Sequence, residues 1–347
     1  MIVSKKILIL ADPDSIHTKK WAEGWESLGY DCVISGLSSK KFDNQFIFYA
    51  NLIREGGNAK VFLQKIFAFQ RVLKKVNPDI INVHYLTSYG FIASLIKRKK
   101  DKMVLSLHGT DVMQTMDKNI VYLFLAKFIF YRSDLIVSVS HEMTKKILYY
   151  FPNVKEKIIT QQYGINLEFL NQFQTENKEI DILTNRGWVK NSNYEIILET
   201  LIHFVDYSLA IIGDDDSFYA KELKKKFSSL HPFIYKQLPY EKNLTFIARS
   251  KVFISLTTSD GTPLSLLEAM YLGAIPIVSD IKSIHEIIKD GVNGFIIPIE
   301  KEKLYKTINL IFHLPQEKIK KIQMINKNLV QERFDRKKNF QLIDRLL

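Results

Sequence analysis

Short runs of β-branched and other apolar residues recur along the chain and alternate with longer segments that have helical amphipathic spacing. In the first half, strands are predicted at 6–10, 31–35, 80–84, 103–107, 135–139 and 158–161. Helices are predicted at 18–28, 61–76 and 88–96, with a further pair between residues 113 and 131. This alternation predicts a parallel sheet with helices on both of its faces.

The alternation stops at a polar stretch, residues 171–178, and then begins again. Strands are predicted at 180–184, 208–212, 233–237, 252–257, 275–279 and 294–297, with helices at 194–204, 218–230, 244–249, 263–272 and 284–289. A chain of 347 residues is too long for one ordinary domain and sufficient for two. The expected fold class is therefore α/β, with two Rossmann-like doubly wound domains at 1–172 and 179–330 and a terminal helix at 331–347. Ligands of such sheets bind beyond the C-terminal strand ends, so the cleft between the domains is the expected site.

Composition is that of an ordinary globular protein, with 46% hydrophobic and 25% charged residues. The single cysteine, Cys32, falls in a predicted strand, where a half-buried packing role is expected rather than a nucleophile. One thiol forms no internal disulfide, which fits a reducing compartment. The apolar run near the N-terminus, residues 7–11, is too short for a secretion signal or a membrane span, so a cytoplasmic protein is expected.

Positive charge is concentrated in the first half of the chain. Residues 1–170 carry 24 basic and 15 acidic side chains, and the remainder carries 25 and 22. The densest basic run, 97–102, is either a solvated helix end or a surface attracted to anionic lipid or an anionic acceptor. Peripheral attachment to the inner membrane face therefore stays open. The apolar segment 121–131, interrupted by Lys127, predicts a buried or interfacial helix. No motif typical of nucleic-acid binding accompanies the charge.

Candidate chemistry centres on SDGTPLSLLEAM, residues 259–270, which places Asp260 and Glu268 on either side of a turn that opens a helix. Pro263 suits the first helical position, where its missing N–H costs nothing. Backbone N–H groups of the turn would then favour an anion such as a diphosphate, and Glu268 could accept hydrogen bonds from ribose hydroxyls. The alternative is a simple capped helix, with Asp260 or Thr262 as N-cap and Glu268 solvated.

The longer stretch DGTPLSLLEAMYLGAIPIV, residues 260–278, resembles the signature of the family-4 retaining glycosyltransferases, the glycosyl transferases group 1. Further similar segments are LSLHGTDV at 105–112, QYGINLEFL at 162–170, TNRGWVKN at 184–191 and IHEIIKDGVNGFIIP at 284–298. Together they span nearly the whole chain. The resemblance implies the GT-B fold, in which two Rossmann-like domains face a nucleotide-sugar site and the last helix crosses back to the first domain. Phe334, Phe340, Ile343 and Leu346 would form the apolar face of that helix.

The resemblance also implies residue roles. Glu268 would bind the ribose hydroxyls and Asp260 the hydroxyls of the donor sugar, while Arg186 and Lys190 would neutralise the diphosphate. His108 would lie beside the anomeric carbon. The implied catalytic set is His108, Asp260, Arg186 and Lys190, and the implied donor-binding set is Glu268, Gly261, Thr262, Pro263, Leu264 and Glu286. Two cations and a helix N-terminus would stabilise the leaving diphosphate, so no metal or other cofactor is expected.

Simpler interpretations stay open for several of these residues. Arg186 could form an ordinary ion pair, Lys190 could be a solvated loop lysine, and His108 could be a loop histidine with satisfied hydrogen bonds. Glu286 could contact the nucleotide or cap its neighbours. The run Asp214 to Asp216 favours a turn and helix cap over a metal site.

The pattern departs from the family after the first strand, where residues 11–18 lack the glycine pair that approaches the donor phosphate in many relatives. Asp12, Ser15 and His17 are therefore acceptor-side candidates, together with Tyr85 at another strand end. Lys282 and Ser283 replace a common glycine pair near the donor sugar, which leaves that sugar open.

The resemblance implies a retaining glycosyltransferase of the hexosyltransferase class, with a UDP-sugar as the expected donor. The expected acceptor is lipid-linked or a surface polysaccharide or other glycan. Partners would then be the nucleotide-sugar, the acceptor and, as an open alternative, an anionic membrane surface, with no nucleic acid. Two other functions stay open: a catalytically silent GT-B protein that binds a nucleotide-sugar or supports a partner enzyme, and a nucleotide-sugar epimerase.

Overall fold

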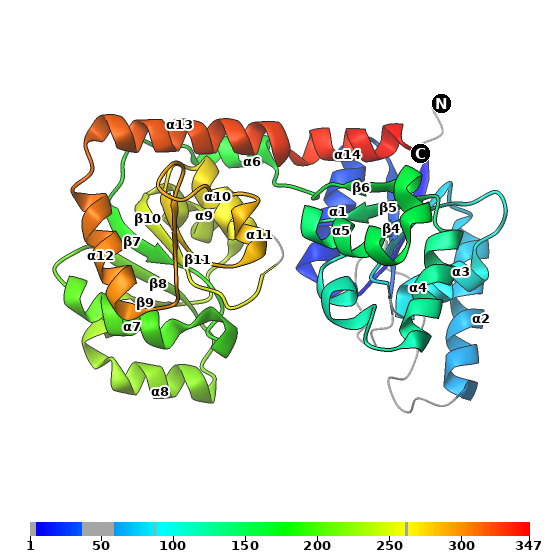
Figure 1. Cartoon of the computed structure of the whole chain (residues 1–347), viewed down its shortest axis with the longest axis horizontal. Helices are drawn as coiled ribbons and strands as arrows, with labels where there is room; N and C mark the ends of the chain where they lie inside the picture. The colour runs from blue at the N-terminus through cyan, green and yellow to red at the C-terminus, as the bar shows by residue number, and fades with distance from the viewer. Residues whose placement is uncertain (1–4, 37–58, 87, 261–262) are drawn as a thin grey trace. The chain divides into compact units, whose positions relative to one another are not determined.

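The computed structural model describes residues 5–36, 59–86, 88–260 and 263–347, and the chain divides into two compact units. The first unit contains Met1–Tyr163 and Arg336–Leu347, and the second contains Gly164–Asp335. Each unit is built on one six-stranded parallel sheet (Figure 1). The predicted α/β fold class with two doubly wound sheets is confirmed.

The first sheet has the order β2-β1-β3-β4-β5-β6, so the strand order reverses between β1 and β3. Its strands are β1 (Lys6–Leu10), β2 (Asp31–Ser35), β3 (Ile80–His84), β4 (Lys102–Ser106), β5 (Leu135–Ser138) and β6 (Ile158–Thr160). Such a reversal point opens a crevice at the C-terminal strand ends, where doubly wound proteins bind ligands. Strands β1, β3 and β4 are nearly continuous apolar runs and are almost entirely buried, as expected for a sheet covered on both faces.

Helices cover both faces of this sheet. They are α1 (Ile16–Glu26), α2 (Ala59–Val76), α3 (Ser88–Ile96), α4 (Ile120–Arg132) and α5 (His141–Tyr150), with a π-helical turn at Asp111–Thr115 and a 3₁₀ helix at Pro152–Lys157. The main apolar core of the unit lies between the sheet and α2 to α5. Helix α5 was not predicted from the sequence. Cys32 is buried in β2, and burial raises the pKa of its thiol to about 12, which fits a packing role.

The C-terminal helix α14 (Arg336–Arg345) packs against α1 within the first unit. The ring of Phe340 contacts Trp21 and Trp25, with centroids 5.0 and 5.2 Å away. Gly24 allows this approach, because a Cβ at that position would lie 2.2 Å from the Phe340 ring. Leu346 is half exposed and does not share the predicted apolar face.

The predicted helix at the C-terminus is interrupted. Helix α13 (Gln316–Arg333) ends before Phe334, and α14 begins at Arg336. Phe334 is buried in a core of the second unit, and its carbonyl accepts a hydrogen bond from the Ile165 N–H over 2.8 Å. This pairing outside the helix explains why the helical hydrogen bonds do not continue.

The second sheet has the order β12-β11-β10-β7-β8-β9 and reverses between β10 and β7. Its strands are β7 (Ile180–Thr184), β8 (Leu209–Asp214), β9 (Ile234–Lys236), β10 (Ser250–Ser255), β11 (Ile275–Ser279) and β12 (Phe295–Ile297). The helices are α6 (Leu167–Leu170), α7 (Tyr194–Leu201), α8 (Phe218–Lys226), α9 (Tyr240–Ala248), α10 (Leu264–Tyr271), α11 (Lys282–His285), α12 (Lys301–Phe312) and α13, with 3₁₀ helices at Asn171–Phe173, Lys190–Ser192, Ile202–Phe204 and Ser228–Phe233.

Two helix predictions in this unit were wrong in position. The helix predicted at 284–289 is the short α11, which ends at His285. The helix predicted at 244–249 begins four residues earlier, at Tyr240 after Pro239, which is its N-cap residue. Among the described helices, none has the length and apolar character that a membrane crossing would require.

Candidate functional site

In the second unit, Arg186 and Asp260 meet beyond the ends of β7 and β10, the two strands at the reversal point. Arg186 Nη2 lies 2.5 Å from Asp260 Oδ2, and the side chains are 24% and 15% exposed. The ion pair that the sequence left open for Arg186 is therefore present. Because the pair is only partly covered, both groups can still be reached by a ligand.

The backbone around Arg186 is held by buried groups. The hydroxyl of Tyr194, which is fully buried, lies 2.7 Å from the Arg186 carbonyl oxygen. Gly213 has a φ of +110° and passes close to the same carbonyl, where a Cβ would lie 2.3 Å from the oxygen. A glycine is needed there on both counts.

Two asparagines join the loop after β7 to the loop after β10. Asn191 exchanges hydrogen bonds with Ser259, from Nδ2 to the carbonyl over 2.9 Å and from the Ser259 N–H to Oδ1 over 3.1 Å. Asn193 Nδ2 donates to the Leu256 carbonyl over 2.8 Å. The sequence analysis missed both asparagines. Lys190 begins the 3₁₀ helix Lys190–Ser192, which lies between β7 and α7, and its side chain is exposed.

Glu268 is buried within α10, with 4% of its surface exposed. The alternative in which Glu268 is solvated is therefore wrong. The Tyr240 hydroxyl donates a hydrogen bond to Glu268 Oε1 over 2.7 Å, and the Tyr240 ring stacks on Phe169. A buried carboxylate is costly without partners, and the Tyr240 hydroxyl supplies one of them. Tyr240 was also missed, because the prediction started α9 too late.

The turn that precedes α10 differs slightly from the prediction. Pro263 is the N-cap residue, and the helix begins at Leu264, which is partly buried. Among the described residues no side chain caps this helix, so the alternative in which Asp260 is the N-cap is not found. Gly261 and Thr262, which were predicted to bind the donor, lie outside the described residues.

Residues around α11 adjoin this turn. The Ser283 hydroxyl donates to the Asp260 carbonyl over 2.6 Å. Glu286 is the C-cap residue of α11 and is partly exposed, and its carbonyl accepts a hydrogen bond from Arg333 Nη1 over 3.0 Å. The structure therefore brings Arg186, Asp260 and Ser283 into one connected set of contacts.

The acidic run after β8 forms a turn. Ser217 caps α8, the Asp215 carboxylate accepts from the Ser217 N–H over 3.0 Å, and Asp216 pairs with Lys224 and Lys236. No group of three or more His, Cys, Asp or Glu side chains suited to a metal ion is found within the described part of the chain.

In the first unit, three histidines gather beyond the ends of β1, β3 and β4. The His108 ring lies 4.8 Å from the His84 ring and 5.9 Å from the His17 ring, measured between centroids. Tyr85 lies 4.5 Å from His108 and has a left-handed backbone, with φ of 67°. Strained residues of this kind cluster at functional sites.

Burial keeps two of these histidines neutral. It lowers the pKa of His108 to about 3, with a further contribution from His17, and it lowers the pKa of His84 well below its ordinary value. Within the described part of the chain, neither His108 Nε2 nor the two ring nitrogens of His84 have a hydrogen-bond partner. His108 Nε2 therefore departs from the interpretation of a loop histidine with satisfied hydrogen bonds.

Asp111 positions the loop that carries His108. Its buried carboxylate accepts hydrogen bonds from the N–H groups of Leu86, His108 and Gly109 over 3.0, 3.2 and 2.9 Å. It therefore joins the segment after β3 to the segment after β4, and it begins the π-helical turn. Irregular turns of this kind are frequent at functional sites. The sequence contained the signal, since Asp111 lies in the His-Gly-Thr-Asp segment.

The acceptor-side candidates divide into two groups. His17 and Tyr85 belong to the His108 cluster, with ring centroids 5.9 and 4.5 Å from that of His108. His17 is exposed, and its Nδ1 lies 2.6 Å from the Tyr163 hydroxyl. Asp12 is exposed and accepts from the Asp14 N–H over 3.1 Å. Burial raises the pKa of Tyr85, with smaller effects from the charges of Asp111 and Asp12. Ser15 precedes α1 and makes no side-chain capping bond.

Comparison with known proteins finds a match to a glycosyl transferase family in each unit. The profile of "Glycosyl transferase 4-like" proteins matches residues 6–140, and that of "Glycosyl transferases group 1" matches residues 168–328. An uncharacterized glycosyltransferase of Methanocaldococcus jannaschii is 22% identical over 249 residues, which are 69% of this chain and 68% of the relative. The N-acetyl-alpha-D-glucosaminyl L-malate synthase of Bacillus anthracis is 24% identical over 251 residues, 65% of this chain and 62% of the relative.

Solved structures agree on the fold. The Anabaena protein HepE, crystallised with UDP and glucose, has a TM-score of 0.76 at 16% identity, and 98% of each chain is covered. At this identity the similarity demonstrates the GT-B-like fold alone. The two family matches, one in each unit, show that the chain belongs to the group 1 glycosyltransferases, with a glycosyl transferase 4-like first unit.

Proposed function

We propose that the chain transfers a sugar, with retention, from a nucleotide-sugar to a glycan or lipid-linked acceptor, and that the donor is a UDP-sugar. The observation that carries this proposal is the buried carboxylate of Glu268, which lies on the helix that follows Asp260. The Tyr240 hydroxyl donates a hydrogen bond to it. A carboxylate accepts hydrogen bonds from two adjacent hydroxyls, which a ribose presents. The complex of HepE with UDP and glucose supports a UDP-sugar for this chain.

The partly exposed pair of Arg186 and Asp260 suits the rest of the donor. Cleavage of the bond between the anomeric carbon and the phosphate oxygen leaves negative charge on the diphosphate. Arg186 and Lys190 would stabilise that charge, and Asp260 would accept hydrogen bonds from the sugar hydroxyls. A fixed cation is most effective when its position is set before reaction. Tyr194 and Asp260 set the position of Arg186 in this way.

Residues of the first unit would act on the sugar and the acceptor. With its pKa near 3, His108 is neutral at physiological pH, so it would orient a hydroxyl by hydrogen bonding rather than carry a proton. The acceptor hydroxyl attacks the anomeric carbon, and its proton passes to an oxygen of the leaving diphosphate. His17 and Tyr85 are the proposed acceptor contacts. The positive charge of the first half supports a location at the inner membrane face.

Calorimetry with UDP, GDP and ADP on the wild type and on Glu268→Gln tests the donor. We expect UDP to bind the wild type and Glu268→Gln to bind it at least about tenfold more weakly, because a hydrogen bond to a charged group contributes about 1.5–3 kcal/mol. Tyr271→Phe is the matched control, since it removes a 2.6 Å hydrogen bond to Asn171 from the same helix. Equal UDP affinity in Glu268→Gln would contradict the assignment.

Incubation with the sugar conjugate of the nucleotide that binds separates the remaining functions. A transferase leaves the donor intact or hydrolyses it slowly until an acceptor is added, whereas an epimerase converts it to its isomer. Binding of no nucleotide at all would favour the catalytically silent alternative.

A further inference from the structure

An apolar stripe runs along the outer side of α4. Ile120, Val121, Phe124 and Tyr131 are 63, 60, 66 and 80% exposed, and Phe128 is 36% exposed. At 3.6 residues per turn these five positions lie on one side of the helix. Ala126, Ile129 and Phe130 occupy the opposite side and are buried against the sheet. The helix therefore has two apolar sides, of which the core of the unit uses only one.

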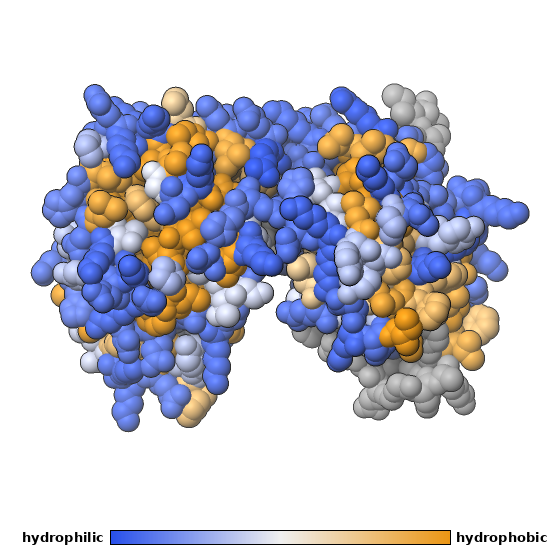
Figure 2. All heavy atoms as spheres, viewed as in Figure 1, coloured by the Kyte–Doolittle hydropathy of each residue, from blue (hydrophilic) through white to orange (hydrophobic). Residues whose placement is uncertain are grey.

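The neighbouring helices extend this surface. Helix α3 packs against both α2 and α4, and the rings of Phe91 and Phe128 are in contact between α3 and α4. Leu63 and Phe67 on α2 are 52 and 58% exposed, and Leu95 on α3 is 43% exposed. Figure 2 shows hydrophobic side chains gathered on the surface over the part of the first unit where Figure 1 labels α4 and α2. We call this three-helix surface the outer face.

The helices of the outer face carry basic residues and no acidic ones. Helices α2, α3 and α4 contain no Asp or Glu, whereas every other described helix of eight or more residues contains at least one. Helix α2 carries exposed Arg71, Lys74 and Lys75, and on α4 Lys127 stands exposed between Phe124 and Phe128. Among the described helices of eight or more residues, the three without acidic residues are thus three that pack side by side.

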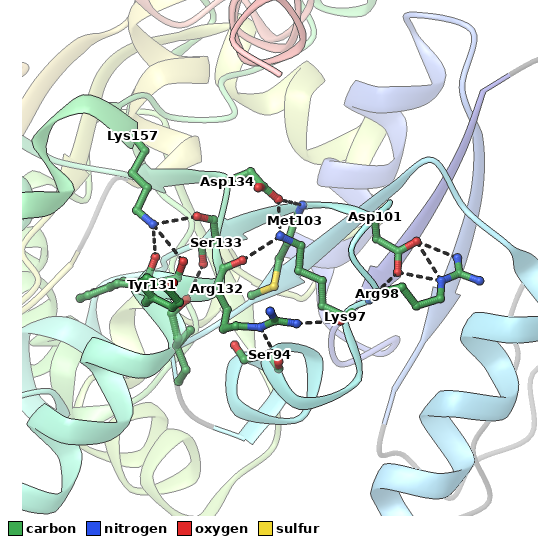
Figure 3. Close-up of polar contacts among 12 residues, drawn as sticks. Ser94, Lys97, Arg98, Asp101, Met103, Tyr131, Arg132, Ser133, Asp134 and Lys157 are labelled. Atoms are coloured by element: carbon green, nitrogen blue, oxygen red, sulfur yellow. Dashed lines mark hydrogen bonds and ion pairs between the residues drawn. The ribbon is translucent and has the colours of Figure 1, made fainter.

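Polar contacts hold α3 and α4 together at their C-terminal ends (Figure 3). Arg132 donates to the carbonyls of Ser94 and Lys97 over 2.9 and 2.6 Å, and Lys97 Nζ donates to the Arg132 carbonyl and pairs with Asp134. Lys157 Nζ donates to the Ser133 carbonyl over 2.9 Å. Lys97 and Arg132 thus place positive charge at the C-terminal ends of helices, where it offsets the negative end of the helix dipole. This agrees in part with the interpretation of residues 97–102 as a helix end. The helices therefore present one preorganised surface.

We propose that the outer face docks on an anionic lipid bilayer. Phe124, Phe128 and Tyr131 would enter the boundary between headgroups and acyl chains, and Lys127 and the α2 cations would contact lipid phosphates. A lysine within an apolar stripe favours lipid over a protein partner, because lysine is depleted in protein interfaces but can extend its ammonium group to the headgroups. The proposal rests on the location at the inner membrane face given under the proposed function and names the surface that would bind there. Docking itself requires no nucleotide-sugar donor.

Vesicle flotation of the full chain tests the proposal. We expect the wild type to float at low salt with vesicles of equal parts phosphatidylglycerol and phosphatidylcholine, and to float poorly with phosphatidylcholine alone. The double variant Phe124→Ser, Tyr131→Ser should partition at least tenfold more weakly, and Lys127→Ser about fivefold more weakly, the effect of one basic residue near the surface. Phe218→Ser is the matched control, since Phe218 is 77% exposed on α8 in the second unit.

Three outcomes would overturn the proposal. These are a wild type that does not float with anionic vesicles, a double variant that floats as well as the wild type, and a wild-type dimer that the double variant dissociates while neither floats. The last would assign the outer face to a second copy of the chain. UDP calorimetry on the double variant separates this test from the donor site. Loss of flotation with unchanged UDP binding supports the bilayer proposal, and flotation of a wild type that binds no nucleotide would refute only the donor proposal.

Discussion

Arg186 and Asp260, 74 positions apart in the chain, form an ion pair with 2.5 Å between Nη2 and Oδ2. The two groups that the family resemblance assigns to diphosphate and sugar are thus paired with each other. The carboxylate orients the guanidinium, and it also places a negative charge beside the expected position of the diphosphate.

Replacement of Asp260 should therefore separate binding from catalysis. Asp260→Asn removes the negative charge and releases Arg186, so we expect UDP to bind as tightly as in the wild type or more tightly. The rate of transfer should fall about 10²-fold, by analogy with the loss of one fixed hydrogen-bonding group at a transition state. Calorimetry with UDP and initial rates with donor and acceptor give the two quantities. Weaker UDP binding would mean that Arg186 needs the carboxylate to keep its position.

Tyr240 should support nucleotide binding through Glu268. Tyr240→Phe removes the 2.7 Å hydrogen bond to Glu268 and leaves the ring on Phe169, so UDP affinity should fall about fivefold, the effect of a hydrogen bond of about 1 kcal/mol. In a double-mutant cycle with Glu268→Gln, the two losses should not add. Strictly additive losses in calorimetry would show that Tyr240 contacts the nucleotide independently.

Asp111 should affect turnover without affecting the donor half of the site. Asp111→Asn leaves one acceptor oxygen where the carboxylate accepts three backbone hydrogen bonds, so the His108 loop should shift. We expect kcat to fall at least about tenfold, because a misplacement of about 1 Å can cost about 10²-fold in rate. UDP affinity should stay unchanged, since the donor residues lie in the second unit. A fall in UDP affinity with kcat unchanged would contradict a positioning role.

The neutral histidines predict loss of stability in acid. Because burial lowers the pKa of His108 from 6.5 to about 3, the unfolded chain binds a proton below pH 6.5 that the folded protein does not. Stability is therefore fully present above pH 6.5 and falls as the pH decreases toward 3, by about 1.4 kcal/mol per pH unit for each such histidine. Urea unfolding of wild type and His108→Asn between about pH 7 and pH 5 measures this slope. Equal slopes would contradict the buried neutral state.

Gly24 gives a test of packing in the first unit. In an exposed helix position, Gly→Ala stabilises by roughly 0.5–1 kcal/mol. At Gly24 the new methyl group would meet the Phe340 ring, so we expect destabilisation of about 1–3 kcal/mol in urea unfolding. Glu26→Ala, an exposed position on the same helix, is the control. Stabilisation by Gly24→Ala would show that α14 does not pack on α1 as described.

Much of the fold could be predicted from local pattern. Strands at 6–10, 31–35, 80–84, 180–184 and 275–279 have the predicted bounds, because a strand covered on both faces must be a short apolar run between polar turns. Helix α5 was missed, and the terminal helix was predicted without its break. That break depends on the Ile165 N–H, which pairs with the Phe334 carbonyl from a distant part of the chain.

The sequence by itself determined the family, through the motif around Asp260 and Glu268. The motif is a single continuous segment, and its residue types are those that the expected chemistry requires. Only the tertiary structure showed that Tyr240 holds Glu268 and that Arg186 pairs with Asp260. It also showed that His84 lies beside His108, and that both His84 ring nitrogens and His108 Nε2 lack hydrogen-bond partners among the described residues. These contacts join segments from different strand ends. Parallel strands bring their C-terminal ends to one edge of a sheet, and no local spacing in the chain records which side chains meet there.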